Sequence, residues 1–248
     1  MNTPFEFAAR AAVAVLTLPL LLGCGDDSMA DGGAAAPAFT ADALPPLPPP
    51  ESFSADLTNP YLAFETGRKF HYETLTDEGL ETNLVEVTNQ TQVIAGVTVR
   101  VVHDLVYLNG DLIEDTLDWY AEDQDGNVWY FGEDTKQILN GEVVGTEGSW
   151  TAGIEGPPGI IMLAEPELGM KYKQEDATGI AEDMGKVVGL SEQVVVPYGT
   201  FEGCLKTAEW SLLESGPRDF KFYAPGIGLV LEIGGRGRRE RVELTAID

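Results

Sequence analysis

The sequence predicts an all-β domain, an antiparallel meander that forms a barrel, a half-barrel or two packed sheets. Three observations predict this fold class. Short runs rich in Val, Thr, Tyr, Phe and Trp follow one another from about Asn59 to the C-terminus. Gly, Asn and Asp residues, which favour turns, separate these runs. No segment has a helical pattern of convincing length.

The first 23 residues have the organisation of a secretory signal peptide. Arg10 precedes an apolar run, residues 11–22, that is too short to span a membrane. Leu21-Leu22-Gly23-Cys24 then resembles the lipobox of bacterial lipoproteins, whose cysteine receives diacylglycerol and becomes the first mature residue. The resemblance implies that acyl chains on Cys24 anchor the protein to a membrane. The alternative is an ordinary signal peptide with a cysteine there by chance.

The residues after the signal peptide predict a tether that links the lipidated cysteine to the domain. Residues 24–58 comprise the lipidated cysteine and a Gly/Ala/Pro-rich tether, which has too little apolar surface to fold. Residues 59–248 then form a single acidic extracytoplasmic domain. Because Gly25 rather than Asp follows Cys24, the inner-membrane retention signal is absent. We therefore expect the chain in the outer membrane of a host with two membranes, and otherwise at the cell surface.

Three dipeptides mark the centre of the domain as a series of hairpins. Asn109-Gly110 joins the runs 97–108 and 111–120, and Asn-Gly tolerates the positive φ angles of a type I′ turn. Asp125-Gly126 and Asn140-Gly141 mark the next two turns. The Gly- and Pro-rich stretch 147–170 is expected to be a long loop. Further strands are expected at 69–75, 84–94, 170–174, 186–190, 193–196, 204–213, 220–224, 228–233 and 239–245.

The charge of the chain excludes one class of partner. Acidic residues number 41 against 15 basic ones, and the resulting net charge of -26 repels a phosphate backbone. We therefore expect no nucleic-acid binding. The last hairpin carries a basic cluster that we expect to neutralise nearby carboxylates, with an anion site as the alternative. This cluster comprises Arg236, Arg238, Arg239 and Arg241.

The sequence contains no catalytic motif. His71 and His103 are the only histidines and are expected to be ordinary strand residues with hydrogen-bonded partners, so a zinc or copper site is not expected. Cys204 is expected to be a buried thiol without a disulfide. Neither a Gly-x-Ser-x-Gly elbow nor a phosphate loop occurs. We therefore expect a binding protein rather than an enzyme, and a hydrolase or isomerase using paired carboxylates is the alternative.

Calcium is the candidate cofactor, because one short loop concentrates oxygen ligands. Asp123, Asp125 and Asn127 lie in this loop, although the position of its glycine does not match an EF-hand. The alternative is a plain hairpin turn with solvated acids. If calcium binds, the domain would act as a calcium-stabilised envelope scaffold.

Aromatic residues suggest a ligand-binding surface. Trp119, Tyr120, Trp129 and Tyr130 place large rings on both faces of one hairpin. One face is expected to pack in the core, and the other could bind an apolar or glycan-like ligand or a protein partner. Structural packing of both faces is the alternative.

Several longer motifs of this sequence resemble motifs of a known group of proteins. Trp119-Tyr120-Ala121, Asp125-Gly126-Asn127-Val128-Trp129-Tyr130-Phe131-Gly132-Glu133 and Tyr223-Ala224-Pro225-Gly226-Ile227-Gly228-Leu229-Val230 carry the resemblance. With them the domain is similar to a family of functionally uncharacterised secreted bacterial proteins and lipoproteins. The resemblance implies a shared β-rich fold and brings no activity, cofactor or catalytic residue.

Overall fold

The computed structural model describes residues 44–214, 216, 218–234 and 240–248. The predicted signal peptide, Cys24 and most of the tether lie outside these residues, as do Arg236, Arg238 and Arg239. One 3₁₀ helix, η1 (Pro50–Ser52), precedes the strands. The strands are β1 (Phe53–Ser54), β2 (Lys69–Thr76), β3 (Gly79–Ile94), β4 (Val97–Leu108), β5 (Asp111–Asp123), β6 (Val128–Leu139), β7 (Glu142–Gly145), β8 (Trp150–Thr151), β9 (Gly159–Met162), β10 (Lys171–Lys173), β11 (Asp183–Val196), β12 (Gly199–Ser211), β13 (Asp219–Ala224), β14 (Gly228–Gly234) and β15 (Glu240–Ile247).

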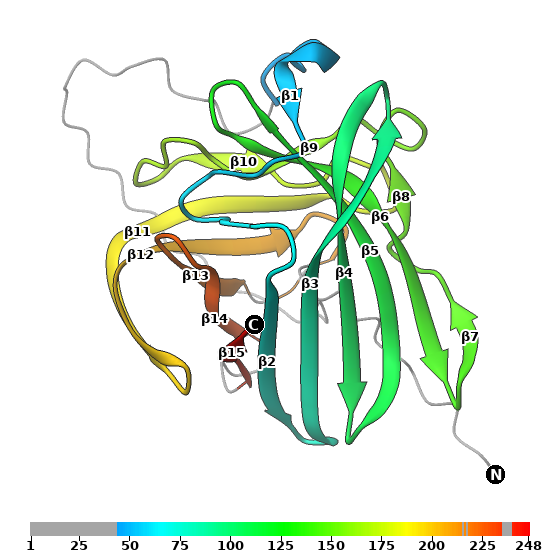
Figure 1. The fold of residues 1–248 in the computed structure, drawn as a ribbon, viewed down its shortest axis with the longest axis vertical. Coiled ribbons are helices and arrows are strands. Elements are labelled where there is room, and N and C mark those ends of the chain that lie inside the picture. The colour runs from blue at the N-terminus through cyan, green and yellow to red at the C-terminus, as the bar shows by residue number, and fades with distance from the viewer. Residues whose placement is uncertain (1–43, 215, 217, 235–239) are drawn as a thin grey trace.

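All of these strands belong to one sheet, and the all-β prediction is confirmed. The main path runs β10-β11-β12-β13-β14-β15-β2-β3-β4-β5-β6-β7, and every pairing is antiparallel. Neighbours along the chain are thus neighbours in the sheet, as a meander requires, except where β15 pairs with β2. The sheet curves strongly, so that β11 and β12 face β3–β6 across its concave side (Figure 1).

The hairpin turns follow from backbone conformation. Asn109 and Gly110 have φ of 52° and 93°, and Asn140 and Gly141 have φ of 55° and 81°, as type I′ turns require. At Asp125-Gly126 only the glycine has a positive φ. This turn is longer, since the backbone hydrogen bond that closes it joins the Asp123 N–H to the Asn127 carbonyl. A further turn with two positive φ angles lies at 95–96, between β3 and β4, where the sequence offers an alanine instead of asparagine.

Two expectations about strand extent differ from the structure. The expected strands 186–190 and 193–196 form one strand, β11. The residues between them shift the register of the pairing with β12, near Gly189, but do not end it. The expected long loop 147–170 contains two short strands, β8 and β9, that both pair with β6. Gly132 permits the first of these contacts, since a Cβ there would lie 2.1 Å from the Trp150 carbonyl oxygen.

The loop after β8 also brings the two ends of the sheet together. Pro158 forms an isolated antiparallel bridge with Glu175, which follows β10. Since β9 pairs with β6, this bridge connects the β6 side of the sheet with its β10 side. The concave side is therefore enclosed by the sheet and by this loop.

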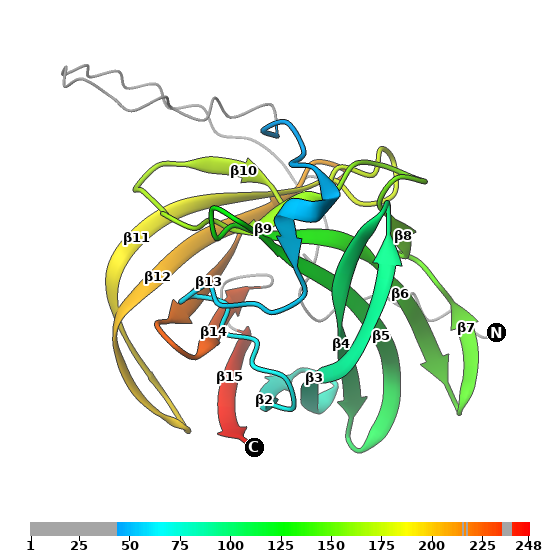
Figure 2. The ribbon, with the colours of Figure 1, turned by 45° about the horizontal axis from the view of Figure 1, so that its top comes forward.

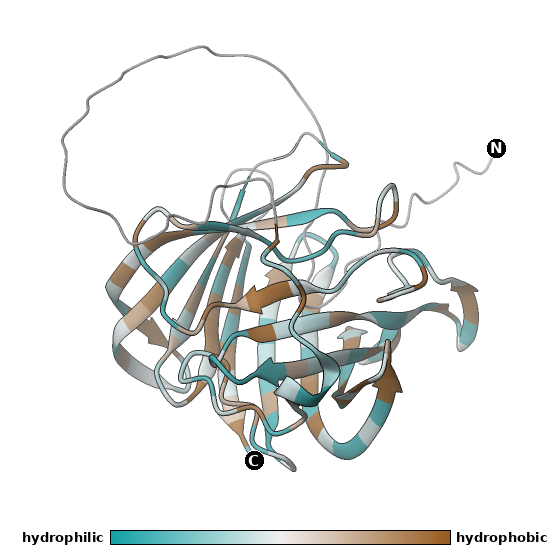
Figure 3. Cartoon of the chain, turned by 90° about the horizontal axis from the view of Figure 1, so that it is seen from above, coloured by the Kyte–Doolittle hydropathy of each residue, from teal (hydrophilic) through white to brown (hydrophobic). Residues whose placement is uncertain are grey.

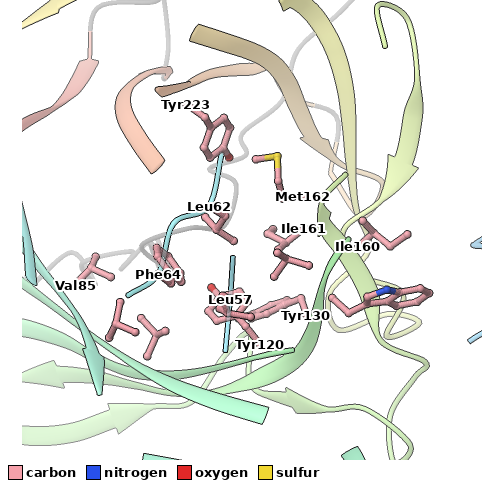
Figure 4. Packing of buried hydrophobic residues seen from close by; sticks show 14 of the residues in the cluster. Leu57, Leu62, Phe64, Val85, Tyr120, Tyr130, Ile160, Ile161, Met162 and Tyr223 are labelled. Carbon is pink, nitrogen blue, oxygen red and sulfur yellow. The ribbon is translucent and has the colours of Figure 1, made fainter. Parts of the chain in front are cut away.

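The segment before β2 fills one end of the concave side (Figure 2). Its side chains Leu57, Leu62 and Phe64 are buried among rings and aliphatic groups from several strands (Figure 4). Phe64 contacts Tyr120 edge-to-face, with ring centroids 5.6 Å apart. β1 pairs with β5, so the folded domain extends N-terminally of Asn59 into the segment that the sequence assigned to the tether.

Polar and apolar residues alternate along most strands, visible as bands of colour in Figure 3. Alternation places successive side chains on opposite faces of a strand. In β5, for example, the buried positions Glu114, Thr116 and Asp118 alternate with half-buried ones. The side chains on the concave face are thus polar in one part of the domain and apolar where the N-terminal segment enters.

Candidate functional site

Acidic side chains project from three adjacent strands into the concave side of the sheet. Asp104 of β4 pairs with Thr116 of β5, and Asp118 of β5 pairs with Glu133 of β6. All four side chains are buried. Carboxylates are almost never fully buried unless they are paired or protonated. We call Asp104, Asp118 and Glu133, with the Tyr130 hydroxyl, the interior acid cluster.

Tyr130 joins two of these carboxyl groups. Its hydroxyl lies 2.6 Å from Asp118 Oδ1 and 2.8 Å from Glu133 Oε2. A phenol has only one proton to donate, so it satisfies both contacts only if one carboxyl group is protonated and donates to the phenol oxygen. The geometry therefore holds an additional proton among the three groups.

Electrostatics indicate which carboxyl group carries this proton. Burial, followed by repulsion from Asp118, raises the pKa of Glu133 to about 8. Burial also raises the pKa of Asp118, to about 6, against the opposing effect of the Tyr130 hydrogen bond. At neutral pH, Glu133 is therefore the protonated member of the pair and Asp118 the ionised one.

Asp104 lacks such a partner. Its side chain is only 1% exposed, yet among the described residues neither carboxylate oxygen has a hydrogen-bond partner. Asn83 comes near enough to lower its pKa but does not reach hydrogen-bond geometry. Burial, with the negative charges of Asp118 and Glu114, raises the pKa of Asp104 well above its usual value. A buried acid with unused acceptors is costly, and such groups are more common at functional sites than elsewhere.

The segment that follows β10, which bridges to the enclosing loop at Pro158, adds a further acid. Glu175 accepts a hydrogen bond of 2.8 Å from the Trp150 indole N–H. Burial and the neighbouring Asp183 raise the pKa of Glu175 well above its usual value, and Glu133 contributes to this shift. The polar interior therefore extends from the interior acid cluster to the segment following β10.

A second polar group, on β12–β14, is compensated internally. Lys221 Nζ lies 2.9 Å from Glu209 Oε2 and 4.0 Å from Glu232 Oε2. Thr207 and Tyr223 donate hydrogen bonds to the other Glu209 oxygen. Burial alone would lower the pKa of Lys221, but Glu209 and Glu232 reverse the shift and raise it. This group has the character of a structural ion pair.

The four aromatic residues predicted to bind a ligand are all buried. Tyr120 and Tyr130 stack on the concave face with ring centroids 5.0 Å apart. Trp129 instead packs edge-to-face against Phe53 of β1, at 6.0 Å. Trp119 is buried as well, and its indole N–H has no partner in the described residues. The structure thus brings Tyr120 and Tyr130 to the interior acid cluster and gives Trp129 a packing role.

The loop predicted to bind calcium holds its own turn together. Asp123 Oδ1 accepts hydrogen bonds from the backbone N–H groups of Asp125 and Asn127, both at 2.9 Å. Its Oδ2 accepts hydrogen bonds from the Asn127 side-chain amide at 3.0 Å and from the Trp129 indole N–H at 2.7 Å. Each oxygen therefore already accepts two hydrogen bonds, and a cation would have to displace them. In the described residues, no three His, Cys, Asp or Glu side chains are grouped as metal ligands. Calcium binding at this loop remains a prediction.

Residues of the same hairpin also form hydrogen bonds with the N-terminal segment. Glu122 accepts hydrogen bonds from the backbone N–H groups of Thr58 and Asn59. The Asn59 amide donates to the carbonyl groups of Gly126 and Leu163, at 2.9 and 3.0 Å. Glu122 and Asn59 therefore connect three segments that are distant along the chain.

The remaining candidate residues have ordinary partners. His71 lies 2.9 Å from Asp248, and His103 lies 2.8 Å from Asp115, so both predicted hydrogen-bonded histidines are confirmed. Cys204 is a buried free thiol, also as predicted, and burial raises its pKa to about 11. Arg241, the one arginine of the basic cluster that the structure describes, pairs with Glu243 at 2.7 Å.

Comparisons with known proteins assign no family. No family model matches the chain, and no curated protein matches it. Among solved structures, it is similar to a protein of Parabacteroides distasonis ATCC 8503 described as a putative lipoprotein. The identity is 11%, the TM-score is 0.41, and the match covers 76% of this chain and 98% of that one. A likeness at this level assigns neither fold nor function.

Proposed function

We propose that the chain is an exported lipoprotein, anchored in the cell envelope through Cys24, whose β domain binds a ligand without catalysis. The signal-like residues 1–23, the lipobox and the Gly/Ala/Pro-rich tether support the anchor. None of the helices in the described part of the chain is long and apolar enough to cross a membrane. Gly25 rather than Asp after Cys24 supports an outer-membrane location in a host with two membranes.

The anchor predicts a defined response to one substitution. The wild-type chain should enter the detergent phase of a Triton X-114 extract and carry the mass of acyl chains on Cys24. Cys24→Ser should remove that mass and shift the protein to the aqueous phase, because the acyl chains supply the membrane affinity. Recovery of the wild-type protein from the cytosol, uncleaved and without acyl mass, would refute the anchor.

The interior acid cluster supports a polar ligand over an apolar one. Asp104 carries this proposal, because neither oxygen of its buried carboxyl group has a hydrogen-bond partner in the described residues. A hydroxyl-rich, glycan-like ligand would supply the missing donors, and the adjacent Thr116 and Thr135 hydroxyls and Tyr130 could orient it. Tyr120 and Tyr130, two of the four aromatic residues predicted from the sequence, are placed to contribute.

Mass spectrometry of small molecules that co-purify with the full chain tests this ligand. We expect a polar molecule in wild-type protein and its loss from Asp104→Asn, in which one acceptor oxygen is replaced by a donor. Asp111→Asn, at the exposed first position of β5, is the matched control and should retain the molecule. Co-purification of a protein or an apolar molecule, equally in all three samples, would reject Asp104 as the binding residue.

One observation favours a second function, hydrolysis by paired carboxyl groups. Asp118 and Glu133 contact the same hydroxyl and differ in pKa, which is the relation between a nucleophile or base and a general acid in glycoside hydrolases. If the pair is catalytic, Glu133→Gln should lower turnover of chromogenic glycosides by about 10²- to 10⁴-fold. Turnover that is absent from wild type, or unaffected by the substitution, would exclude this function.

A further inference from the structure

Lysine side chains gather on the outer face of the strands opposite the interior acid cluster. Lys171 of β10 pairs in register with Lys186 of β11, which pairs with Ala208 of β12. Their strand neighbours Tyr172 and Thr207 are buried on the concave side, so alternation turns the lysines outward. Lys206, two residues from Ala208, lies on the same outer face. We call Lys171, Lys186 and Lys206 the lysine face.

These cations are not neutralised by the protein itself. In the part of the chain that the structure describes, no carboxylate lies within ion-pair distance of Lys171, Lys186 or Lys206. By contrast, Lys69 and Lys136 on other strands each have an acidic partner, at 2.9 and 3.1 Å. Unpaired lysines are conspicuous in a chain with a net charge of -26, where acids far outnumber them.

Aromatic rings beneath the lysine face are already covered by cations. Lys206 Nζ lies 4.7 Å from the Phe220 ring centroid and 5.0 Å from that of Phe222. The Arg218 guanidinium lies 4.3 Å from the ring centroid of Trp210. Rings covered in this way are not open for stacking against a sugar. The lysine face therefore presents positive charge above a partly buried aromatic layer, an arrangement suited to the polar boundary of a bilayer.

We propose that the lysine face rests on the anionic phospholipid headgroups of the membrane to which the chain is anchored. This orientation rests on the proposed lipid anchor, which keeps the domain close to that surface. Screening limits electrostatic interactions to about 8 Å at physiological ionic strength, so the face nearest the membrane decides attraction or repulsion. A face that is mostly acidic would be repelled, whereas the lysine face is attracted.

Vesicle binding by the mature chain, residues 24–248 with Cys24→Ser, tests the surface without any acyl group or signal peptide. We expect this protein to sediment with phosphatidylglycerol–phosphatidylcholine vesicles, to remain free with pure phosphatidylcholine, and to dissociate as salt is raised. Adding Lys171→Gln, Lys186→Gln and Lys206→Gln should weaken partitioning onto the anionic vesicles about tenfold or more. Adding Arg68→Gln, Lys69→Gln and Lys136→Gln instead changes net charge equally and should leave partitioning within about twofold.

Several outcomes would overturn the proposal. These are equal losses in the two triple variants, equal binding to neutral and anionic vesicles, and binding to a soluble anionic polysaccharide in preference to vesicles. Equal melting temperatures for the two triple variants would show that any difference in partitioning is not due to unfolding. Because the tested chain has no acyl group, the result is independent of whether Cys24 is lipidated in the cell.

Discussion

Replacing Glu133 by Gln is expected to stabilise the domain at pH 8 while changing its stability little at pH 5. Glu133 has a pKa of about 8 in the folded protein, against a usual value of 4.5. Between these values the folded state retains a proton that the unfolded state has lost. The free energy of unfolding therefore falls as pH rises through this window, and the loss is complete above pH 8.

The size of this effect follows from proton linkage. One group in its linkage window changes the free energy of unfolding by about 1.4 kcal/mol per pH unit. Asp118, with a pKa of about 6, adds a loss of the same sign at lower pH. Asp104 and Glu175, whose pKa values are also raised by burial, act in the same direction. Wild-type protein should therefore be several kcal/mol less stable at pH 8 than at pH 5, on the order set by these shifts.

Glu133→Gln removes the titrating group but retains its shape and hydrogen-bonding capacity. The amide can donate to the Tyr130 oxygen, as the protonated carboxyl group does, while Tyr130 donates to Asp118. We expect a gain of about 1–3 kcal/mol at pH 8, measured by urea unfolding at both pH values. Glu142→Gln on exposed β7 is the matched control and should follow wild type. A melting temperature of wild type that does not change from pH 5 to pH 8 would contradict this account.

Replacing Lys221 by Met is expected to cost the domain about 3–5 kcal/mol of unfolding free energy at pH 7. Lys221 and Glu209 are each no more than 2% exposed, and their ion pair is 2.9 Å long. Removing the lysine leaves the Glu209 carboxylate buried without its cation, and the hydrogen bonds from Thr207 and Tyr223 do not replace a full charge. The desolvation penalty of that carboxylate is the source of the loss.

Two further variants separate this explanation from a loss of packing. Lys221→Met combined with Glu209→Gln removes both charges and should recover a large part of the lost stability. Lys69→Met breaks an exposed ion pair with Glu86 and should cost less than about 1 kcal/mol. If Lys221→Met cost no more than Lys69→Met, or if the double variant were less stable than the single one, burial of the pair would not explain its contribution.

Much of the fold could be predicted from residue order because β-meanders are built from local contacts. The Asn109-Gly110 and Asn140-Gly141 turns, the boundaries of β4 and the absence of long helices from the described residues all follow from short-range preferences. The same reasoning missed the turn at 95–96, where alanine adopts a positive φ that its sequence does not favour. It also assigned β1 and Leu57 to the tether, because their contacts are with strands far along the chain.

The candidate site could be predicted only in part. Tyr120 and Tyr130 were identified from the aromatic hairpin, but Asp118 and Glu133 could not be distinguished among 41 acids. One signal was present in retrospect. Asp104 shares its strand face with Val102 and Val106, and an acid in such an apolar series indicates an inward-facing carboxyl group.

The sequence by itself determined the all-β class, most of the hairpins and the resemblance to a lipobox at Cys24, because each of these depends on residues that are neighbours along the chain. Only the tertiary structure decided that Tyr130 lies between Asp118 and Glu133, that Asp104 is buried without a partner among the described residues, and that three lysines without an acidic partner there share one outer face. These are relations between strands, and they depend on register and sheet curvature. Residue type alone specifies a carboxyl group, whereas the distance to its neighbours and its access to water determine whether it binds a proton, a cation or a ligand.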